Sequence, residues 1–143
     1  MSSESNLWNW LSVPVGTVIP TAFDIQRIEN SVGIGVPDVE GCIDGVQFWV
    51  ELKSLKRPKR KSTKLRVKFR NGQVHWIVNR YYSGGISGVL LSVGGKNTIE
   101  RYFLNGKNVL ILGEPILEAD LASFKVEKSS IDFLRNIHKR GKL

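Results

Sequence analysis

The dipeptide Asp44-Gly45 is the feature that most constrains the fold of this chain. It separates two strand-like runs, 36–43 and 46–54, and Asp-Gly between such runs favours a two-residue turn with positive φ at both positions. We therefore expect a β-hairpin in which Ile43 lies opposite Val46. The same register places Asp38 opposite Glu51, with Cβ atoms about 4.5–5.5 Å apart.

The predicted hairpin has one apolar and one charged face, because side chains alternate along a strand. The apolar face, which we expect in the core, comprises Val39, Ile43, Val46, Phe48, Val50 and Leu52. The opposite face carries Asp38, Glu51 and Lys53. Two facing carboxylates repel unless one is protonated or a cation binds. Oxygen ligands suit Mg²⁺ or Mn²⁺ rather than zinc, and Lys53 could then orient a water or stabilise charge on a phosphate.

Other interpretations of this face stay open at this point. The two carboxylates are also compatible with exposed strand positions, one of them neutralised by Lys53. Glu40 is a rival carboxylate, because it shares the face of Asp38 and could pair with Lys64 or Arg66 on a neighbouring strand. A β-bulge would shift the register by one residue.

A basic segment dominates the charge of the chain, whose formal net charge is +8. Positions 53–70 contain ten basic residues and no acidic one: Lys53, Lys56, Arg57, Lys59, Arg60, Lys61, Lys64, Arg66, Lys68 and Arg70. Such a stripe is the electrostatic signature of a polyanion partner, most often a nucleic acid. A solvated flexible loop is the alternative. A membrane surface is disfavoured, because residues 56–64 have no apolar face to insert.

Composition excludes several other classes of site. The single cysteine, Cys42, rules out an intramolecular disulfide and a cysteine-rich zinc site, and His75 and His138 lie far apart. The longest apolar run is far shorter than the roughly 20 residues that span a bilayer. The N-terminus lacks the pattern of a signal peptide. We therefore expect a soluble protein of the cytoplasm.

Apolar periodicity and turn residues predict one mixed α/β domain over 1–143. The expected helices cover 7–11, 21–30, 71–81 and 129–141, with caps at Thr21, Asn71 and Ser129 or Ser130. Beyond the hairpin, the expected strands cover 65–69, 88–93, 98–104 and 109–112. Trp49 and Trp76 are expected in the core, and Trp8 and Trp10 in packing or a dimer contact.

Two short motifs resemble a known nuclease signature. Val36-Pro37-Asp38, followed by Val50-Glu51-Leu52-Lys53, resembles the Pro-Asp…(Asp/Glu)-x-Lys, or PD-(D/E)xK, superfamily of restriction enzymes, junction resolvases and repair nucleases. Glu29 matches the acidic residue that many members carry upstream, and Gln73 matches a glutamine of the VRR-NUC and resolvase-like branches. The stretch from 65 to 85 is similar to small phage-encoded, stand-alone nucleases of that branch. The resemblance covers about residues 22–93, whereas 94–143 match nothing and are expected to add strands and a C-terminal helix of unknown role.

The resemblance implies a restriction-endonuclease-like αβββαβ core, with a mixed central sheet flanked by helices. It implies that Asp38 and Glu51, with Glu29 directly or through water, hold Mg²⁺ or Mn²⁺. Lys53 would position the attacking water and stabilise the developing charge, and Gln73 would orient a water, Lys53 or the scissile phosphate. The basic residues Lys56, Arg57, Lys59, Arg60, Lys61, Lys64, Arg66, Lys68 and Arg70 would contact DNA phosphates that flank the cut.

The resemblance further implies a metal-dependent, structure-selective DNA endonuclease, active in the cytoplasm of a bacterial cell or of a phage-infected host. The expected substrate is branched DNA such as a four-way (Holliday) junction. A homodimer is the expected assembly, because two symmetric incisions need two sites. Two alternatives stay open: a nicking or restriction-like nuclease that acts on plain duplex DNA, and a non-catalytic DNA-binding module on the same fold.

Overall fold

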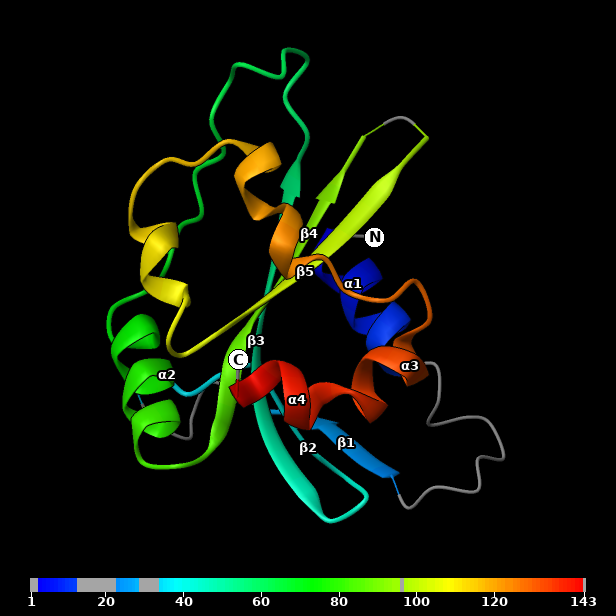
Figure 1. Cartoon of the computed structure of the whole chain (residues 1–143), viewed down its shortest axis with the longest axis vertical. Coiled ribbons are helices and arrows are strands. Elements are labelled where there is room, and N and C mark those ends of the chain that lie inside the picture. The colour runs from blue at the N-terminus through cyan, green and yellow to red at the C-terminus, as the bar shows by residue number, and fades with distance from the viewer. Residues whose placement is uncertain (1–2, 13–22, 29–33, 96, 143) are drawn as a thin grey trace.

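A computed structural model of the chain describes residues 3–12, 23–28, 34–95 and 97–142 and contains a mixed five-stranded sheet (Figure 1). The strands lie side by side in chain order: β1 (Phe23–Arg27), β2 (Val39–Ile43), β3 (Val46–Lys56), β4 (Ile86–Gly94) and β5 (Ile99–Asn105). Neighbouring strands are antiparallel except β3 and β4, which are parallel. A parallel pair needs a crossover connection, and the helix α2 (Gln73–Tyr82) lies in it. With α1 (Ser3–Ser12) at the start, the order of elements confirms the expected αβββαβ core.

Three helices cover one face of the sheet: α1, α3 (Ser130–Arg135) and α4 (Ile137–Lys142) (Figure 1). Leu7 of α1, Phe133 of α3 and Ile137 of α4 are buried there against Val50 and Leu90. The predicted N-terminal amphipathic helix is therefore confirmed, and it packs on the apolar face of the β2–β3 hairpin.

The other face of the sheet is covered by α2 and by two short 3-10 helices, η3 (Val109–Gly113) and η4 (Glu118–Phe124). Ile77 of α2 and Leu121 of η4 are buried in this second core, together with Val89 and Leu91 of β4. Because Leu90 points to the first core and its neighbours to the second, β4 is buried on both faces. This explains its continuous apolar sequence, which is typical of a central parallel strand.

The β2–β3 hairpin forms in the predicted register, with Ile43 paired to Val46 and Val39 paired to Val50. The turn residues Asp44 and Gly45 have φ of 52° and 79°, as a turn of this type requires. The apolar face of the hairpin is directed into the first core, as predicted.

The predicted helix over 21–30 is wrong for the residues that the structure describes. Residues 23–27 form the edge strand β1, which pairs antiparallel with β2. Ile25 is the buried residue of this strand. Its burial, with more exposed neighbours on both sides, shows the two-residue alternation of a half-buried strand rather than a helical period. Glu29 lies outside the described residues.

Two further predicted strands are not strands. Leu65 forms one isolated bridge with Ile116, and residues 66–70 are irregular. Val67 and Phe69 nevertheless pack on the second core, which explains why apolar and basic residues alternate in this part of the sequence. Residues 109–112 belong to the 3-10 helix η3, whose period of about three residues suits the buried pair Val109 and Leu112.

The helix predictions need smaller corrections. Helix α2 begins one residue after Gly72, which has a φ of 86°, so Asn71 is not its cap. The C-terminal helix is split into α3 and α4 at Asn136, whose side-chain amide donates hydrogen bonds to Asp132 O and Glu127 Oε2. No helix in the described ranges has the length and hydropathy needed to cross a membrane.

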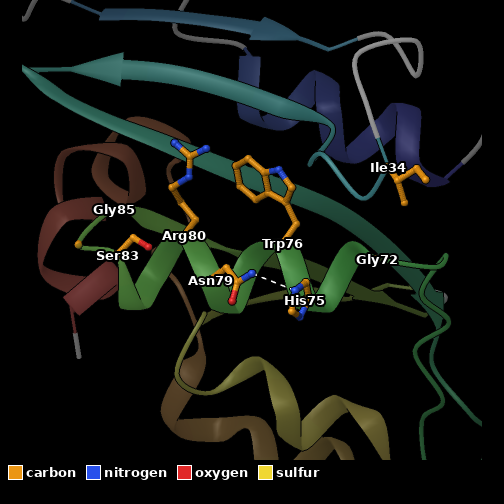
Figure 2. A pocket seen from close by; sticks show the side chains of 9 residues that line it. Ile34, Gly72, His75, Trp76, Asn79, Arg80, Ser83 and Gly85 are labelled. Carbon is orange, nitrogen blue, oxygen red and sulfur yellow. Dashed lines mark hydrogen bonds between the residues drawn. The ribbon is translucent and has the colours of Figure 1, made fainter.

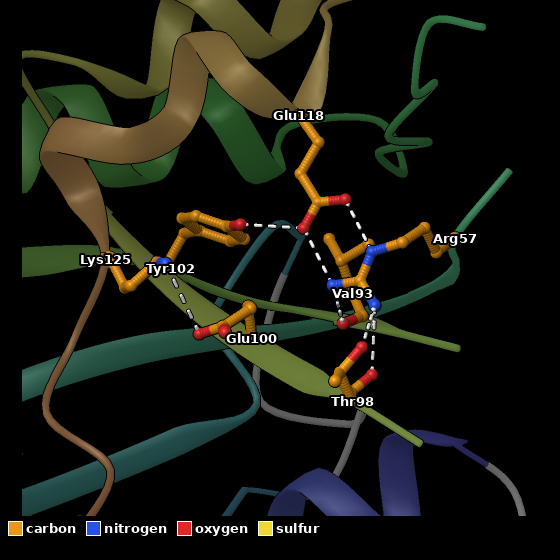
Figure 3. A network of polar contacts seen from close by, with 7 residues as sticks. All are labelled: Arg57, Val93, Thr98, Glu100, Tyr102, Glu118 and Lys125. Atoms are coloured by element: carbon orange, nitrogen blue, oxygen red, sulfur yellow. Dashed lines mark hydrogen bonds and ion pairs between the residues drawn. The ribbon is translucent and has the colours of Figure 1, made fainter. Parts of the chain in front are cut away.

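A polar network joins the ends of the central strands to η4 (Figure 3). The guanidinium of Arg57, just after β3, donates to both carboxylate oxygens of Glu118 at 2.7 and 2.8 Å. It also donates to Thr98 O at 3.0 Å and to Val93 O at 3.2 Å. The Tyr102 hydroxyl donates to the same carboxylate at 2.7 Å. The hydrogen bond from Arg57 is the main cause that lowers the pKa of Glu118 from its ordinary value of 4.5, and Lys125 adds a smaller electrostatic contribution.

We predict that Glu118→Gln lowers the free energy of unfolding by about 1–2 kcal/mol at neutral pH, because it removes a half-buried, bidentate ion pair. Since the pKa of Glu118 is lowered on folding, its contribution is present above the unfolded pKa and is lost as the pH falls through the folded pKa. The difference between the wild type and Glu118→Gln should therefore shrink below about pH 4.5. Urea unfolding of both proteins at several pH values measures this difference in the free energy of unfolding.

The matched control is Glu114→Gln, which removes the same charge from an exposed side chain. It should change the free energy of unfolding by less than about 0.5 kcal/mol. An equal effect of the two variants at neutral pH would show that the Arg57–Glu118 pair does not stabilise the fold.

Candidate active site

Four of the predicted site residues meet on one side of the sheet, beneath the first turn of α2. Asp38 directly precedes β2, Glu51 and Lys53 lie two positions apart on β3, and Gln73 is the first residue of α2. Glu51 and Lys53 share a face because side chains alternate along a strand. The parallel crossover then brings α2 back over that face, so Gln73 contacts Lys53 and Glu51, which lie 20 and 22 positions before it in the chain.

Glu51 is the buried centre of the cluster, with 1% of its surface exposed. Its Oε2 accepts a hydrogen bond from Gln73 Nε2 at 2.8 Å and lies 3.4 Å from Lys53 Nζ. Its Oε1 accepts a hydrogen bond from the backbone N–H of Asp38 at 3.2 Å. Burial and, secondarily, the Asp38 carboxylate raise the pKa of Glu51 to about 7, while Lys53 acts in the opposite direction. A positive charge bound next to Glu51 would therefore stabilise the ionised form of its carboxyl group.

Asp38 lies opposite Glu51, as the register predicts, just beyond the β2–β3 ladder. Its Oδ2 accepts a hydrogen bond from the backbone N–H of Leu52 at 3.1 Å. Pro37, which would face Leu52 in this register, has no N–H, so the backbone ladder ends here. The Asp38 carboxylate takes over part of the pairing and is thereby held beside Glu51.

Gln73 connects the two charged residues of β3. Its Oε1 accepts hydrogen bonds from Lys53 Nζ at 3.1 Å and from the backbone N–H of Arg70 at 2.7 Å, while its Nε2 donates to Glu51. Both lone pairs of the amide oxygen are thus used, which leaves one orientation of this amide. Lys53 is further placed by Phe69, whose ring centre lies 5.1 Å from Nζ. The ammonium group is therefore fixed on three sides.

Two glycines bring the segment before Asp38 against the start of α2. Gly35 has a φ of 80°, and a Cβ atom on it would lie 2.2 Å from Gly72 O. Gly72 has a φ of 86°, and a Cβ atom on it would lie 2.8 Å from Ile34 Cγ2. This close backbone approach holds Asp38 and Gln73 near each other, although they are separated by the whole of the hairpin and the basic segment.

The cluster fits a hard divalent cation. Asp38 and Glu51 offer carboxylate oxygens, and Mg²⁺ is usually held by one or two carboxylates with waters in the other positions. Within the ranges described above, no three His, Cys, Asp or Glu side chains gather into a group that could hold a metal. Glu29, the third expected ligand, lies outside those ranges.

The rival carboxylate Glu40 has other partners. Its two oxygens accept hydrogen bonds from the side-chain amides of Gln26, at 2.8 Å, and Gln47, at 3.3 Å. The alternative pairing with Lys64 or Arg66 on a neighbouring strand does not occur, since neither residue 64 nor residues 66–70 lie in a strand.

Apart from Lys53, which belongs to the carboxylate cluster, the basic segment separates into one tethered residue and a set of exposed ones. Arg57 is half-buried in the network with Glu118. The exposed residues are Lys56, Lys59, Arg60, Lys61, Lys64, Arg66, Lys68 and Arg70. They run from the end of β3, past the end of the sheet away from the Asp44-Gly45 turn, to the start of α2 (Figure 1). The segment therefore begins and ends beside the carboxylate cluster.

One feature near the site was missed by the sequence reasoning. Trp49 and Trp76, expected in the core, are half-buried, with ring centres 5.2 Å apart. The guanidinium of Arg80 lies 4.5 Å from the centre of the Trp76 ring and 5.6 Å from that of Trp49. The spacing of Gln73, Trp76 and Arg80 along one helix face was available in the sequence, but the partner strand that they face was not.

No protein-family model matches this sequence, and no curated protein matches it. Among solved structures, the chain is similar to Hjc, a Holliday junction resolvase from the archaeal hyperthermophile Archaeoglobus fulgidus. The TM-score is 0.52 at 16% sequence identity, and the match covers 90% of this chain and 97% of that chain. Such coverage includes most of residues 94–143, for which the sequence suggested no relative. At this identity the likeness concerns the fold, and it confirms the predicted fold class.

We predict that Gly35→Ala lowers the free energy of unfolding by more than about 4 kcal/mol, because the new Cβ atom meets a backbone oxygen that cannot move alone. Gly45→Ala is the matched control, since Gly45 has nearly the same φ, 79°, but no atom within 4 Å of an added Cβ. It should cost only the left-handed backbone strain, about 1–2 kcal/mol. Equal losses for the two variants in urea unfolding would show that the Gly35–Gly72 approach does not constrain the fold.

Proposed function

We propose that this protein is a metal-dependent DNA endonuclease that hydrolyses phosphodiesters in branched DNA such as four-way junctions. The observation that carries the proposal is the cluster of Asp38, Glu51, Lys53 and Gln73, joined by hydrogen bonds on one side of the sheet. Two carboxylates, a lysine and an orienting amide are the groups that metal-assisted attack of water on a phosphate requires.

In the proposed reaction Asp38 and Glu51 would hold Mg²⁺ or Mn²⁺. When bound there, the divalent cation would supply Lewis acidity toward the phosphate and would lower the pKa of a bound water. Hydrogen bonds already hold both carboxylates in place, because Asp38 accepts one from the Leu52 N–H and Glu51 accepts one from Gln73. A cation bound here would favour the ionised form of both groups.

Lys53 acts on the attacking water and on the phosphate. Its ammonium group has three N–H donors. One is directed to Gln73 Oε1 and a second toward Glu51 Oε2, which leaves a third for a water or a phosphate oxygen. A fixed positive charge at this point stabilises the negative charge that develops on the phosphate in the transition state. Gln73 acts as a positioning residue, because it aligns Lys53 and Glu51 through the two ends of one amide.

The exposed part of the basic segment would position the DNA. Lysine and arginine contacts to phosphates fix the register of a nucleic acid without reading its sequence. This favours recognition of DNA shape. The fold neighbour is a Holliday junction resolvase, which makes branched DNA the substrate to test first. A homodimer with two sites would account for paired incisions in such a junction.

The decisive test is cleavage of a labelled four-way junction and of its matched linear duplex, each with Mg²⁺, Mn²⁺ or EDTA. We predict metal-dependent cleavage of the junction that Asp38→Asn and Lys53→Ala reduce by at least about a thousandfold, because each removes a group that acts in the transition state. Both variants should keep DNA binding and a cooperative unfolding transition. Glu40→Gln is the matched control: it removes a carboxylate from the same face of the hairpin and should leave cleavage within about threefold of wild type.

Each other result has a definite meaning. Cleavage of both DNAs would indicate a nuclease that acts on plain duplex DNA. Binding without cleavage at any metal concentration would favour a non-catalytic module on the same fold. Full activity of Asp38→Asn would contradict the assignment of the site.

We also predict that changing Lys59, Arg60 and Lys61 together to glutamine weakens DNA binding and flattens its dependence on salt. Each lost phosphate contact lowers the slope of log K against log salt by about 0.9, so the three together lower it by as much as about 2.7. Fluorescence anisotropy over a salt series measures the slope. The control changes Lys107, Lys128 and Lys139, which are also exposed but lie outside the basic segment. If the two triple variants have the same slope of log K against log salt, Lys59, Arg60 and Lys61 do not contact DNA phosphates.

A further inference from the structure

An open groove with a volume of about 790 Å³ runs along α2, and Figure 2 shows the side chains that line it. One end is formed by Ile34 and Gly72, the residues that bring the Asp38 segment against the start of α2. The other end is formed by Ser83, Gly84 and Gly85, after the helix. The groove therefore starts next to Gln73 and leads away from the site.

Arg80 is held in this groove by aromatic rings rather than by a carboxylate. Figure 2 shows Trp76 and Arg80 side by side between α2 and the strands. The guanidinium centre lies 4.5 Å from the Trp76 ring centre, and the side chain keeps an exposed surface. A guanidinium that stacks on an aromatic face keeps its in-plane N–H donors available, and its orientation is fixed in advance.

The charge of the groove is positive. None of its nine lining residues is acidic, and Arg80 and His75 are the basic ones. Among the residues that the structure describes, Arg80 has no carboxylate within ion-pairing distance, whereas the half-buried Arg57 and Arg140 are paired with Glu118 and Glu127. An ordered arginine fork without an anion is suited to bind a phosphate, since its planar donors match phosphate oxygens.

The distance between Arg80 and the carboxylate cluster can be expressed as a number of nucleotides along a DNA strand. Gln73, Trp76 and Arg80 share one face of α2, and Arg80 lies seven residues after Gln73, or about 10 Å along the helix axis. Trp49, the other ring under the guanidinium, lies two residues before Glu51, or about 7 Å along β3. With a rise of about 3.4 Å per nucleotide in one DNA strand, these distances correspond to about two or three nucleotides.

We infer that the α2 groove binds the sugar-phosphate backbone of the cleaved DNA strand, and that Arg80 contacts the phosphate about two or three nucleotides from the scissile bond. The inference rests on the proposed nuclease function and adds the path of the strand to it. Arg80 is in this view a binding residue whose guanidinium is ordered by Trp49 and Trp76.

The test combines a protein variant with a DNA in which one phosphate at a time is replaced by an uncharged methylphosphonate. The cut is first mapped with the wild type, and dissociation constants are then measured in EDTA for DNAs modified at each of the five phosphates on either side of it. One modified position, two or three nucleotides from the cut, should weaken wild-type binding about tenfold. Arg80→Gln should weaken binding of unmodified DNA by about the same factor. At that one position the two changes together should weaken binding no more than either alone.

Two further variants separate the contact from simple loss of charge or of packing. Arg135→Gln removes the same charge from α3, which covers the opposite face of the sheet. It should leave the effect of every methylphosphonate unchanged. Gly85→Ala keeps the charge but places a Cβ atom 2.8 Å from Arg80 Cδ, so the side chain must shift. It should weaken binding and lose sensitivity at the same phosphate as Arg80→Gln.

The outcomes distinguish this inference from the proposed function. If the effects of Arg80→Gln and of a methylphosphonate on the dissociation constant multiply at every position, Arg80 does not contact the DNA backbone. The inference is then wrong, whereas cleavage by the wild type would still support the proposed function. If Arg80→Gln binds DNA as the wild type does, the groove is not a strand-binding site. If the wild type neither binds nor cleaves any DNA offered, the proposed function fails and the inference fails with it.

Discussion

The carboxylate of Glu51 is buried on the central strand β3, and a buried carboxylate is costly unless donors surround it. Those donors come from different parts of the chain: the backbone N–H of Asp38 before β2, the ammonium of Lys53 on the same strand, and the amide of Gln73 on α2. The hairpin, the centre of the sheet and the crossover helix therefore have to meet at this point. The close backbone contact between Gly35 and Gly72 allows these three elements to meet.

The same facing pair of elements, β3 and α2, continues beyond the carboxylate cluster. Glu51 faces Gln73 at one end, and Trp49 faces Trp76 and Arg80 at the other. The contacts between β3 and α2 thus place the carboxylate cluster and the ordered guanidinium of Arg80 at a fixed distance from each other. In the proposed nuclease, the residues that would bind the DNA and those that would cut it are placed by one strand and one helix.

The basic segment illustrates how a uniform sequence pattern hides two different roles. Arg57 looks like its neighbours in the sequence, yet it is bound by Glu118, about sixty residues later, and ties β3 to η4. Eight other basic residues in 56–70 stay exposed. Spacing along the chain cannot distinguish these cases, because the acidic partner that decides between them lies in a part of the sequence with no motif of its own.

Local chemistry determined the hairpin, and with it most of the candidate site. Asp44-Gly45 selects a turn, the turn selects a register, and the two-residue period then places Asp38, Glu51 and Lys53 on one face. The predictions for segments 21–30, 65–69 and 109–112 were wrong because four to ten residues with mixed apolar spacing are compatible with strand, helix or irregular backbone. The neighbour that decided each case, such as β2 beside Phe23–Arg27 or Ile116 beside Leu65, is distant in sequence. The sequence by itself thus determined that Asp38, Glu51 and Lys53 share one face of the hairpin, because a turn and its ladder are local. The tertiary structure alone decided the raised pKa of Glu51, the tether of Arg57 and the stacking of Arg80, because burial and long-range partners exist only after the chain has folded.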